Sequence, residues 1–145
     1  MGDNAIIAAL GGIKQLGRRV RDPLDMADLI EAGLPRAVMQ HLRAHLALTE
    51  AELAAALGVS TKTLQRQNAR GDSRLTAQQG DRLYRLARIT TLAEEVLEDA
   101  SRAREWLHQP QRGLGSRIPL ELIRTEAGAR EVEDLLGRIE YGVFS

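Results

Sequence analysis

Four polar side chains between residues 61 and 66 have the chemistry needed to contact nucleic acid. Gln65 and Arg66 are the residue types that bind the edges of adenine and guanine, whereas Thr61 and Lys62 suit phosphate oxygens. Leu64 lies between them and is expected to point into a core, which turns the four polar side chains outward. The pattern therefore predicts a helix face that contacts DNA, although a helical hairpin that never meets DNA shows the same pattern.

The elements that must position these side chains lie in the segment LTEAELAAALGVSTKTLQRQNARG, residues 48–71. Thr49 and Glu52 form a capping-box pattern that starts a first helix, and Gly58 permits the left-handed turn that ends it. Ser60 can cap a second helix, which stops near Gly71. Two short helices joined by Gly-Val-Ser predict a helix-turn-helix motif.

Packing within this motif follows from residue size. Leu53 and Leu57 provide the buried face of the first helix, together with Ala54, which has to be small because the second helix crosses over it. Val59 is expected to fill the core beneath the turn. One feature departs from the pattern, because Gln67-Asn68 stands where an apolar residue would help to pack the second helix.

Signals for catalysis or metal binding are weak. The segment GGIKQLG lacks the Gly-Lys-Ser/Thr of a phosphate-binding loop. His41 and His45 have a chelating spacing but no third ligand near them in sequence, and Glu105 with His108 gives only one of the two Glu-x-x-His pairs that a di-metal bundle needs. We therefore expect no metal, no cofactor and no enzymatic activity.

Composition favours packed helices. The chain has 145 residues, 43% of them apolar and only 3% aromatic, and it contains no cysteine. This excludes a disulfide framework and a thiolate zinc site, and a sheet would require more Val, Ile, Tyr and Phe. No apolar run approaches the ~18 residues that span a membrane, and the N-terminal segment does not resemble a signal peptide, so we expect a cytoplasmic location.

Helix signals recur along the rest of the chain. Asp22, Pro23 and Gly33 mark the start and end of one helix, and Val38, Leu42 and Leu46 share one face of the next. Further helices are expected over about 75–99, 101–109 and 119–124, with a loop between 109 and 119. The last helix follows Thr125, with an apolar stripe of Val132, Leu135, Leu136 and Ile139 that we expect to be buried.

Charge and aromatic residues distinguish the end of the chain from its middle. Residues 49–90 carry seven basic and four acidic side chains, whereas residues 91–145 carry seven basic and eleven acidic ones. This asymmetry favours two surfaces with different partners, unless it is chance scatter over solvated helices. The tail EYGVFS contains Phe144, the only phenylalanine, which is either folded against the chain's own core or buried in another molecule.

The C-terminal half resembles the toxin-binding domain of the Xre/MbcA/ParS antitoxin family. The matching elements are Trp106-Leu107, Leu114-Gly115, Pro119-Leu120-Glu121-Leu122, Thr125-Glu126, Gly128-Ala129, Val132-Glu133, Leu135-Leu136, Arg138-Ile139 and Gly142-Val143. The segments LGVSTKTLQR and DRLYRLARI resemble the Xre-like middle of the family, so the resemblance covers about residues 24–145. Gln111 and Ser116 depart from the family's usual Asn and frequent Gly.

The resemblance implies an all-α fold in which an Xre-like helix-turn-helix bundle precedes a small helical toxin-binding domain. Residues 1–90 would hold the N-terminal helices and the motif at about 49–71, and residues 91–145 the toxin-binding domain with its tail. It also implies an antitoxin without chemistry of its own, which covers the NAD site of a cognate RES-domain toxin that consumes NAD⁺ or ADP-ribosylates a protein.

Partners and site residues follow from the same resemblance. The partners would be the toxin and operator DNA, with a homodimer inside a hetero-oligomeric toxin–antitoxin complex that represses its own transcription. The residues expected to contact the toxin are Arg117, Arg138, Tyr141, Gly142, Val143, Phe144 and Ser145. The alternative is a plain Xre-type transcriptional regulator whose C-terminal domain only dimerises. Operator sequence, complex stoichiometry and the toxin's reaction stay open at this level.

Overall fold

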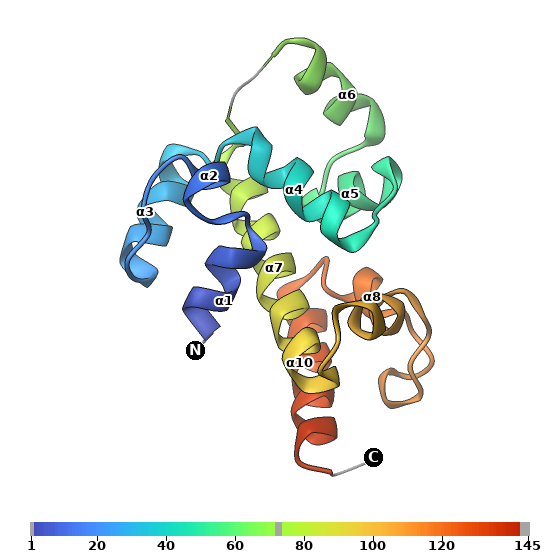
Figure 1. The fold of residues 1–145 in the computed structure, drawn as a ribbon. Coiled ribbons are helices and arrows are strands. Elements are labelled where there is room, and N and C mark those ends of the chain that lie inside the picture. Colours follow the sequence, from blue (N-terminus) through green and yellow to red (C-terminus); the bar gives the residue numbers. More distant parts are fainter. Residues whose placement is uncertain (1, 72–73, 143–145) are drawn as a thin grey trace. The chain divides into compact units, whose positions relative to one another are not determined.

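The computed structural model describes residues 2–71 and 74–142, and over these ranges it confirms an all-α fold (Figure 1). Ten α-helices and one 3₁₀ turn make up the regular structure of the described chain. The residues fall into two compact units, Met1–Ala87 and Arg88–Ser145, and the division lies within the long helix α7 (Ala77–Leu97). No helix in the described ranges combines the length and the apolar character needed to cross a bilayer.

The N-terminal unit begins with two helices that no sequence pattern predicted, α1 (Gly2–Ala9) and α2 (Gly12–Leu16). Gly11 and Gly17 adopt left-handed backbone conformations, with φ of 103° and 78°, and they flank α2 on both sides. Glycine takes up such conformations without a steric cost, so this glycine-rich stretch forms short helices joined by sharp turns.

The start and end of α3 (Pro23–Ala32) are those that the sequence predicts. Asp22 accepts a hydrogen bond from the backbone N of Asp25 at 2.8 Å, and Gly33 ends the helix. Arg21 donates to Oδ2 of Asp25 at 3.0 Å from both its backbone N and its Nε. The side-chain hydrogen bond from Arg21 is the main cause that lowers the pKa of Asp25 below its usual value.

The core of the N-terminal unit is built on α4 (Arg36–Leu46), α5 (Glu50–Leu57), α6 (Thr61–Ala69) and the first part of α7. Its fully buried side chains include Leu34, Val38, Met39, Leu42, Leu46, Leu53, Leu57, Leu64, Leu83 and Leu86, which confirms the predicted inner face of α4. Just before α7, Leu75 N donates to Leu34 O at 2.8 Å, which joins the start of α7 to the segment before α4.

The C-terminal unit contains the end of α7, α8 (Ala100–His108), a 3₁₀ turn (Arg112–Leu114), α9 (Pro119–Leu122) and α10 (Glu126–Glu140). Thr125 caps α10 as predicted, accepting from Gly128 N at 3.0 Å. Val132, Leu135 and Leu136 are buried, but Ile139 is only half-buried, contrary to the expectation. Ile139 lies in the last turn of α10, where less of the described chain covers the helix.

Two polar contacts join α7 to α10 within this unit. Arg88 Nε lies 3.2 Å from Glu133 Oε2, and Arg88 Nη2 donates to Glu133 Oε1 at 3.3 Å. Glu126 Oε1 lies 3.9 Å from the same guanidinium. Arg88 and Glu133 are about 30% exposed and Glu126 is 52% exposed, and no sequence pattern indicated this cluster, which joins α10 to α7.

Candidate functional site

Helices α5 and α6 form the predicted helix-turn-helix within the N-terminal unit, and Figure 1 shows them as two short consecutive helices. The capping box of Thr49 and Glu52 is present, and Gly58 ends α5 with φ 75°. Ser60 caps α6 by accepting from Thr63 N at 3.0 Å. Val59 is half-buried, so it fills the turn less completely than the sequence suggested.

The side chains expected to face DNA lie at the start and middle of α6. Lys62, Gln65 and Arg66 are exposed and Thr61 is half-buried. Gln65 donates from Nε2 to Oε1 of Glu50 at 2.8 Å, so its amide already has a partner on α5. An amide nitrogen carries a second hydrogen and the amide oxygen accepts, which leaves Gln65 able to contact a base while keeping that bond.

The unusual pair Gln67-Asn68 packs the second helix by polar contacts instead of apolar ones. Gln79 is only 4% exposed and donates from Nε2 to Oε1 of Gln67 at 2.9 Å. Arg36 donates from Nη1 to Oδ1 of Asn68 at 2.9 Å. The structure thus anchors α6 with buried Leu64 at its centre and with hydrogen bonds to α7 and α4 near its end.

The last turn of α10 presents an exposed aromatic ring. Tyr141 is 81% exposed, and Gly142 follows it with φ 72°, a conformation that ends the helix. Val143, Phe144 and Ser145, also predicted to contact a toxin, lie outside the described residues. Tyr141 and half-buried Arg138 line the same surface hollow, together with Glu133, Asp134 and Gly137.

Arg117, the remaining residue predicted to contact a toxin, lies in the loop that precedes α9. Its carbonyl accepts from Gln111 N at 3.0 Å, and Ser116 N donates to Gln111 O at 2.9 Å, which closes the loop into a compact turn. Gly115 and Ser116 both have φ 64°, and Ser116 takes this left-handed conformation without being glycine. Arg117 is exposed in this loop, which precedes α10 in the sequence and is not among the segments that line the hollow on α10.

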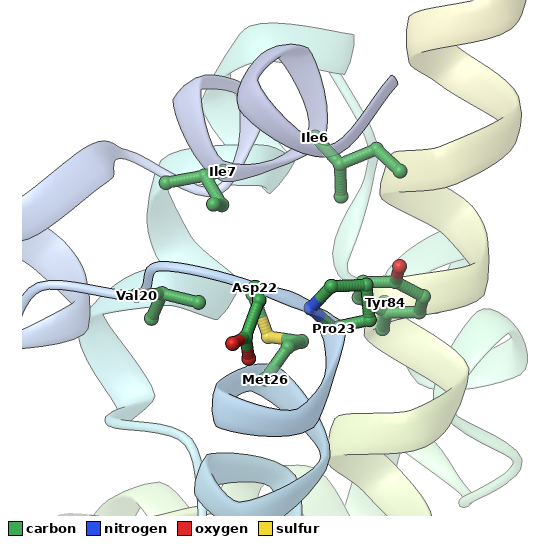
Figure 2. Close-up of a pocket in the computed structure, with 7 residues that line it drawn as sticks. All are labelled: Ile6, Ile7, Val20, Asp22, Pro23, Met26 and Tyr84. Atoms are coloured by element: carbon green, nitrogen blue, oxygen red, sulfur yellow. The ribbon is translucent and has the colours of Figure 1, made fainter. Parts of the chain in front are cut away.

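A small pocket in the N-terminal unit offers little for chemistry (Figure 2). Most of its lining is apolar, and the residues that form it are Ile6, Ile7, Val20, Asp22, Pro23, Met26 and Tyr84. Its carboxylate, from Asp22, is engaged in capping α3. Across the part of the chain that the structure describes, no three His, Asp or Glu side chains converge in a group that could hold a metal ion.

Comparison with known proteins matches both halves of the chain. Residues 92–142 match the family model of the antitoxin Xre/MbcA/ParS C-terminal toxin-binding domain, and residues 25–88 match that of the antitoxin Xre-like helix-turn-helix domain. An antitoxin Xre of Yersinia enterocolitica is 35% identical over 121 residues, which cover 83% of this chain and 81% of that protein.

Two further relatives extend the comparison. An antitoxin Xre of Photorhabdus laumondii is 28% identical over 118 residues, covering 81% of this chain and 79% of the relative. The Prs ADP-ribosylating antitoxin of a Sphingobium species is 24% identical over 132 residues, covering 85% of this chain and 82% of the relative. The similarity therefore runs through both units of the chain.

Proposed function

The chain belongs to the Xre/MbcA/ParS antitoxin family, and on this premise we propose that it neutralises a cognate RES-domain toxin that consumes NAD⁺ or ADP-ribosylates a protein. The antitoxin family is not a catalytic one, so inhibition comes from binding. The name of the Sphingobium relative supports a link to ADP-ribosylation, a reaction that uses NAD⁺ as its substrate.

The observation that carries this proposal is the match of residues 92–142 to a toxin-binding domain that ends on an exposed aromatic residue, Tyr141. Tyrosine is among the residue types that are enriched at the positions carrying most of the binding energy of an interface. Arg117, Arg138 and the segment from Tyr141 to Ser145 contact the toxin, and the tail is the part that covers its NAD site.

The N-terminal unit gives the complex a second role as an operon repressor. Lys62, Gln65 and Arg66 are exposed on α6, the second helix of the motif, which is the one that enters the major groove in helix-turn-helix proteins. A homodimer presents two copies of α6 to a two-fold symmetric operator. The residues that bind the toxin differ from those that bind DNA, so one antitoxin molecule can bind both partners at once.

Co-expression with the neighbouring gene product tests the proposal. The antitoxin is expected to co-purify with a tagged RES-domain protein and to stop that protein from consuming NAD⁺ in a time course. A toxin that stays free of the antitoxin and consumes NAD⁺ at an unchanged rate would reject the proposal. In that case a promoter gel shift that is positive for the antitoxin alone favours a plain transcriptional regulator.

A further inference from the structure

Gly137 lies in the interior of α10, where no contact with the described residues requires a glycine. A glycine in a helix interior is less favourable than alanine, because it loses more backbone freedom on folding. Its φ is not in the left-handed region, and a Cβ built on it meets no described atom within 4 Å beyond the adjacent backbone of α10 itself. An alanine would therefore fit here and would favour the helix.

Gly128, the other glycine of α10, is required by a contact within the described chain. A Cβ on Gly128 would collide with the carbonyl of Leu122, because α9 packs closely against the first turn of α10. Gly128 is buried and its missing side chain lets the two helices meet. Gly137 has no such neighbour among the described residues, so a partner that approaches the backbone from outside would explain the glycine.

The surroundings of Gly137 have the properties of a contact surface. It lies in the middle of the hollow lined by Glu133, Asp134, Arg138 and Tyr141, which follow one side of α10 over two turns. Tyr141 is 81% exposed at one end of this hollow. The Nε of Arg138 is shielded from solvent but has no hydrogen-bond acceptor among the described residues, so an acceptor supplied from outside would stabilise this side chain.

We propose that a main-chain segment of the toxin packs directly on the backbone of α10 at Gly137. The ring of Tyr141 covers one side of this segment, and the guanidinium of Arg138 turns to donate to one of its carbonyl oxygens. Glycine is the residue that allows such a close approach. This inference rests on the proposed function, and the match of residues 92–142 to a toxin-binding domain is what selects the toxin as occupant.

A series of side chains at position 137 tests this contact. Gly137→Ala is expected to raise the Tm of the free antitoxin by about 2–4 °C, because alanine favours the helix. Gly137→Gln keeps good helix propensity and fills the hollow. It is expected to raise the concentration for half-inhibition of NAD⁺ consumption by about tenfold or more, with the alanine variant between it and the wild type. A gain in stability together with a loss of inhibition is the expected signature.

The matched control is Ala127→Gln, which makes a similar enlargement on the same helix at an exposed position outside the hollow. It is expected to inhibit like the wild type. If the wild-type antitoxin itself does not slow NAD⁺ consumption, the proposed function fails. If the wild type inhibits and both Gly137 variants inhibit equally well, only the contact at Gly137 is rejected.

Two other occupants of the hollow give different results. If Gly137→Ala lowers the Tm and deletion of residues 143–145 abolishes that effect, the chain's own tail fills the hollow and the inference is overturned. If the substitutions at 137 change the sedimentation of the free antitoxin while inhibition stays intact, a second copy of the chain occupies it, and the inference is again overturned.

Discussion

The guanidinium of Arg82 lies against the Cα of Gly58 and donates from Nη1 to the carbonyl oxygen of Leu57 at 3.0 Å. Two features therefore favour glycine at position 58. Its φ of 75° favours glycine, and a Cβ at this position would collide with the arginine side chain. The turn of the helix-turn-helix is thus held from α7, through a residue 24 positions further along the chain.

This relationship predicts non-additive stability effects. Gly58→Ala should cost about 1–3 kcal/mol, because it strains the turn and displaces Arg82. Arg82→Ala should cost about 0.5–1.5 kcal/mol through loss of the bond to Leu57. Because the first change already breaks that bond, the double variant should cost less than the sum in urea denaturation. Strictly additive values would show that the two residues act independently.

A second prediction concerns the apolar stripe of α10. Leu136 is fully buried, so Leu136→Ala should cost roughly 2–5 kcal/mol through the lost transfer energy and the cavity left behind. Ile139 is half-buried, and Ile139→Ala should cost clearly less. Thermal melts of the two variants check this order. A Leu136→Ala melt that coincides with the wild type would show that the stripe does not form a core.

Local features of the sequence predicted most of the helices. The capping box of Thr49 and Glu52 and the cap at Asp22 are formed by residues three positions apart, so the chain segment itself specifies them. The all-α fold and the order of helices after residue 22 were predicted for the same reason. Helices α1 and α2 were not predicted, since their glycines obscure the apolar period.

Contacts between distant residues could not be predicted in this way. Gln67 and Asn68 looked like a defect of the second helix, because their partners Gln79 and Arg36 lie 12 and 32 residues away. The hollow around Gly137 is another example, since it depends on which side chains of α10 remain uncovered. Sequence patterns indicate which face of a helix is apolar, but the pairing of polar side chains depends on tertiary packing.

The third prediction concerns DNA binding by α6. Arg66→Ala should cost on the order of 1–3 kcal/mol in binding to the operator, because an arginine on a base edge is removed. Toxin neutralisation should be unchanged, since Arg66 lies in the N-terminal unit. Affinity should fall steeply with salt, because each phosphate that the protein neutralises releases counterions from the DNA. A gel-shift titration of the antitoxin's own promoter in the presence of the toxin measures these affinities. The absence of any shift would contradict the proposed DNA binding.

A fourth prediction follows from the contact between Gln65 and Glu50. The carboxylate of Glu50 accepts from Gln65 Nε2 at 2.8 Å, which places a negative charge beside the proposed DNA face. Glu50→Gln keeps the side-chain size and removes the charge, so operator affinity should rise severalfold at low salt. The loss of an acid from the first turn of α5 should cost about 0.3–1 kcal/mol in stability. Unchanged affinity in a titration at low salt would show that Glu50 does not face the DNA.

The fifth prediction concerns the end of the chain, where two segments are candidates for the proposed role of covering an NAD site on the toxin. One is the tail from Gly142 to Ser145, and the other is the loop from Gly113 to Ile118 that carries Arg117. The loop is closed by the backbone pairing of Gln111 with Arg117, so it is held in one compact shape. The tail follows the left-handed turn at Gly142 and contains Phe144, which makes it the better candidate to enter a pocket.

Deletion of residues 142–145 should therefore weaken inhibition of NAD⁺ consumption by the toxin and leave the Tm and operator binding nearly unchanged. A shorter deletion of residues 143–145 keeps the glycine whose N–H bonds to Ile139 O at 3.1 Å, so it separates loss of the tail from fraying of α10. Arg117→Ala in the full-length chain tests the loop in the same assay. If both truncated proteins inhibit as well as the intact antitoxin while Arg117→Ala does not, the loop covers the site. The aromatic tail then packs on the antitoxin itself, and its deletion should lower the Tm instead.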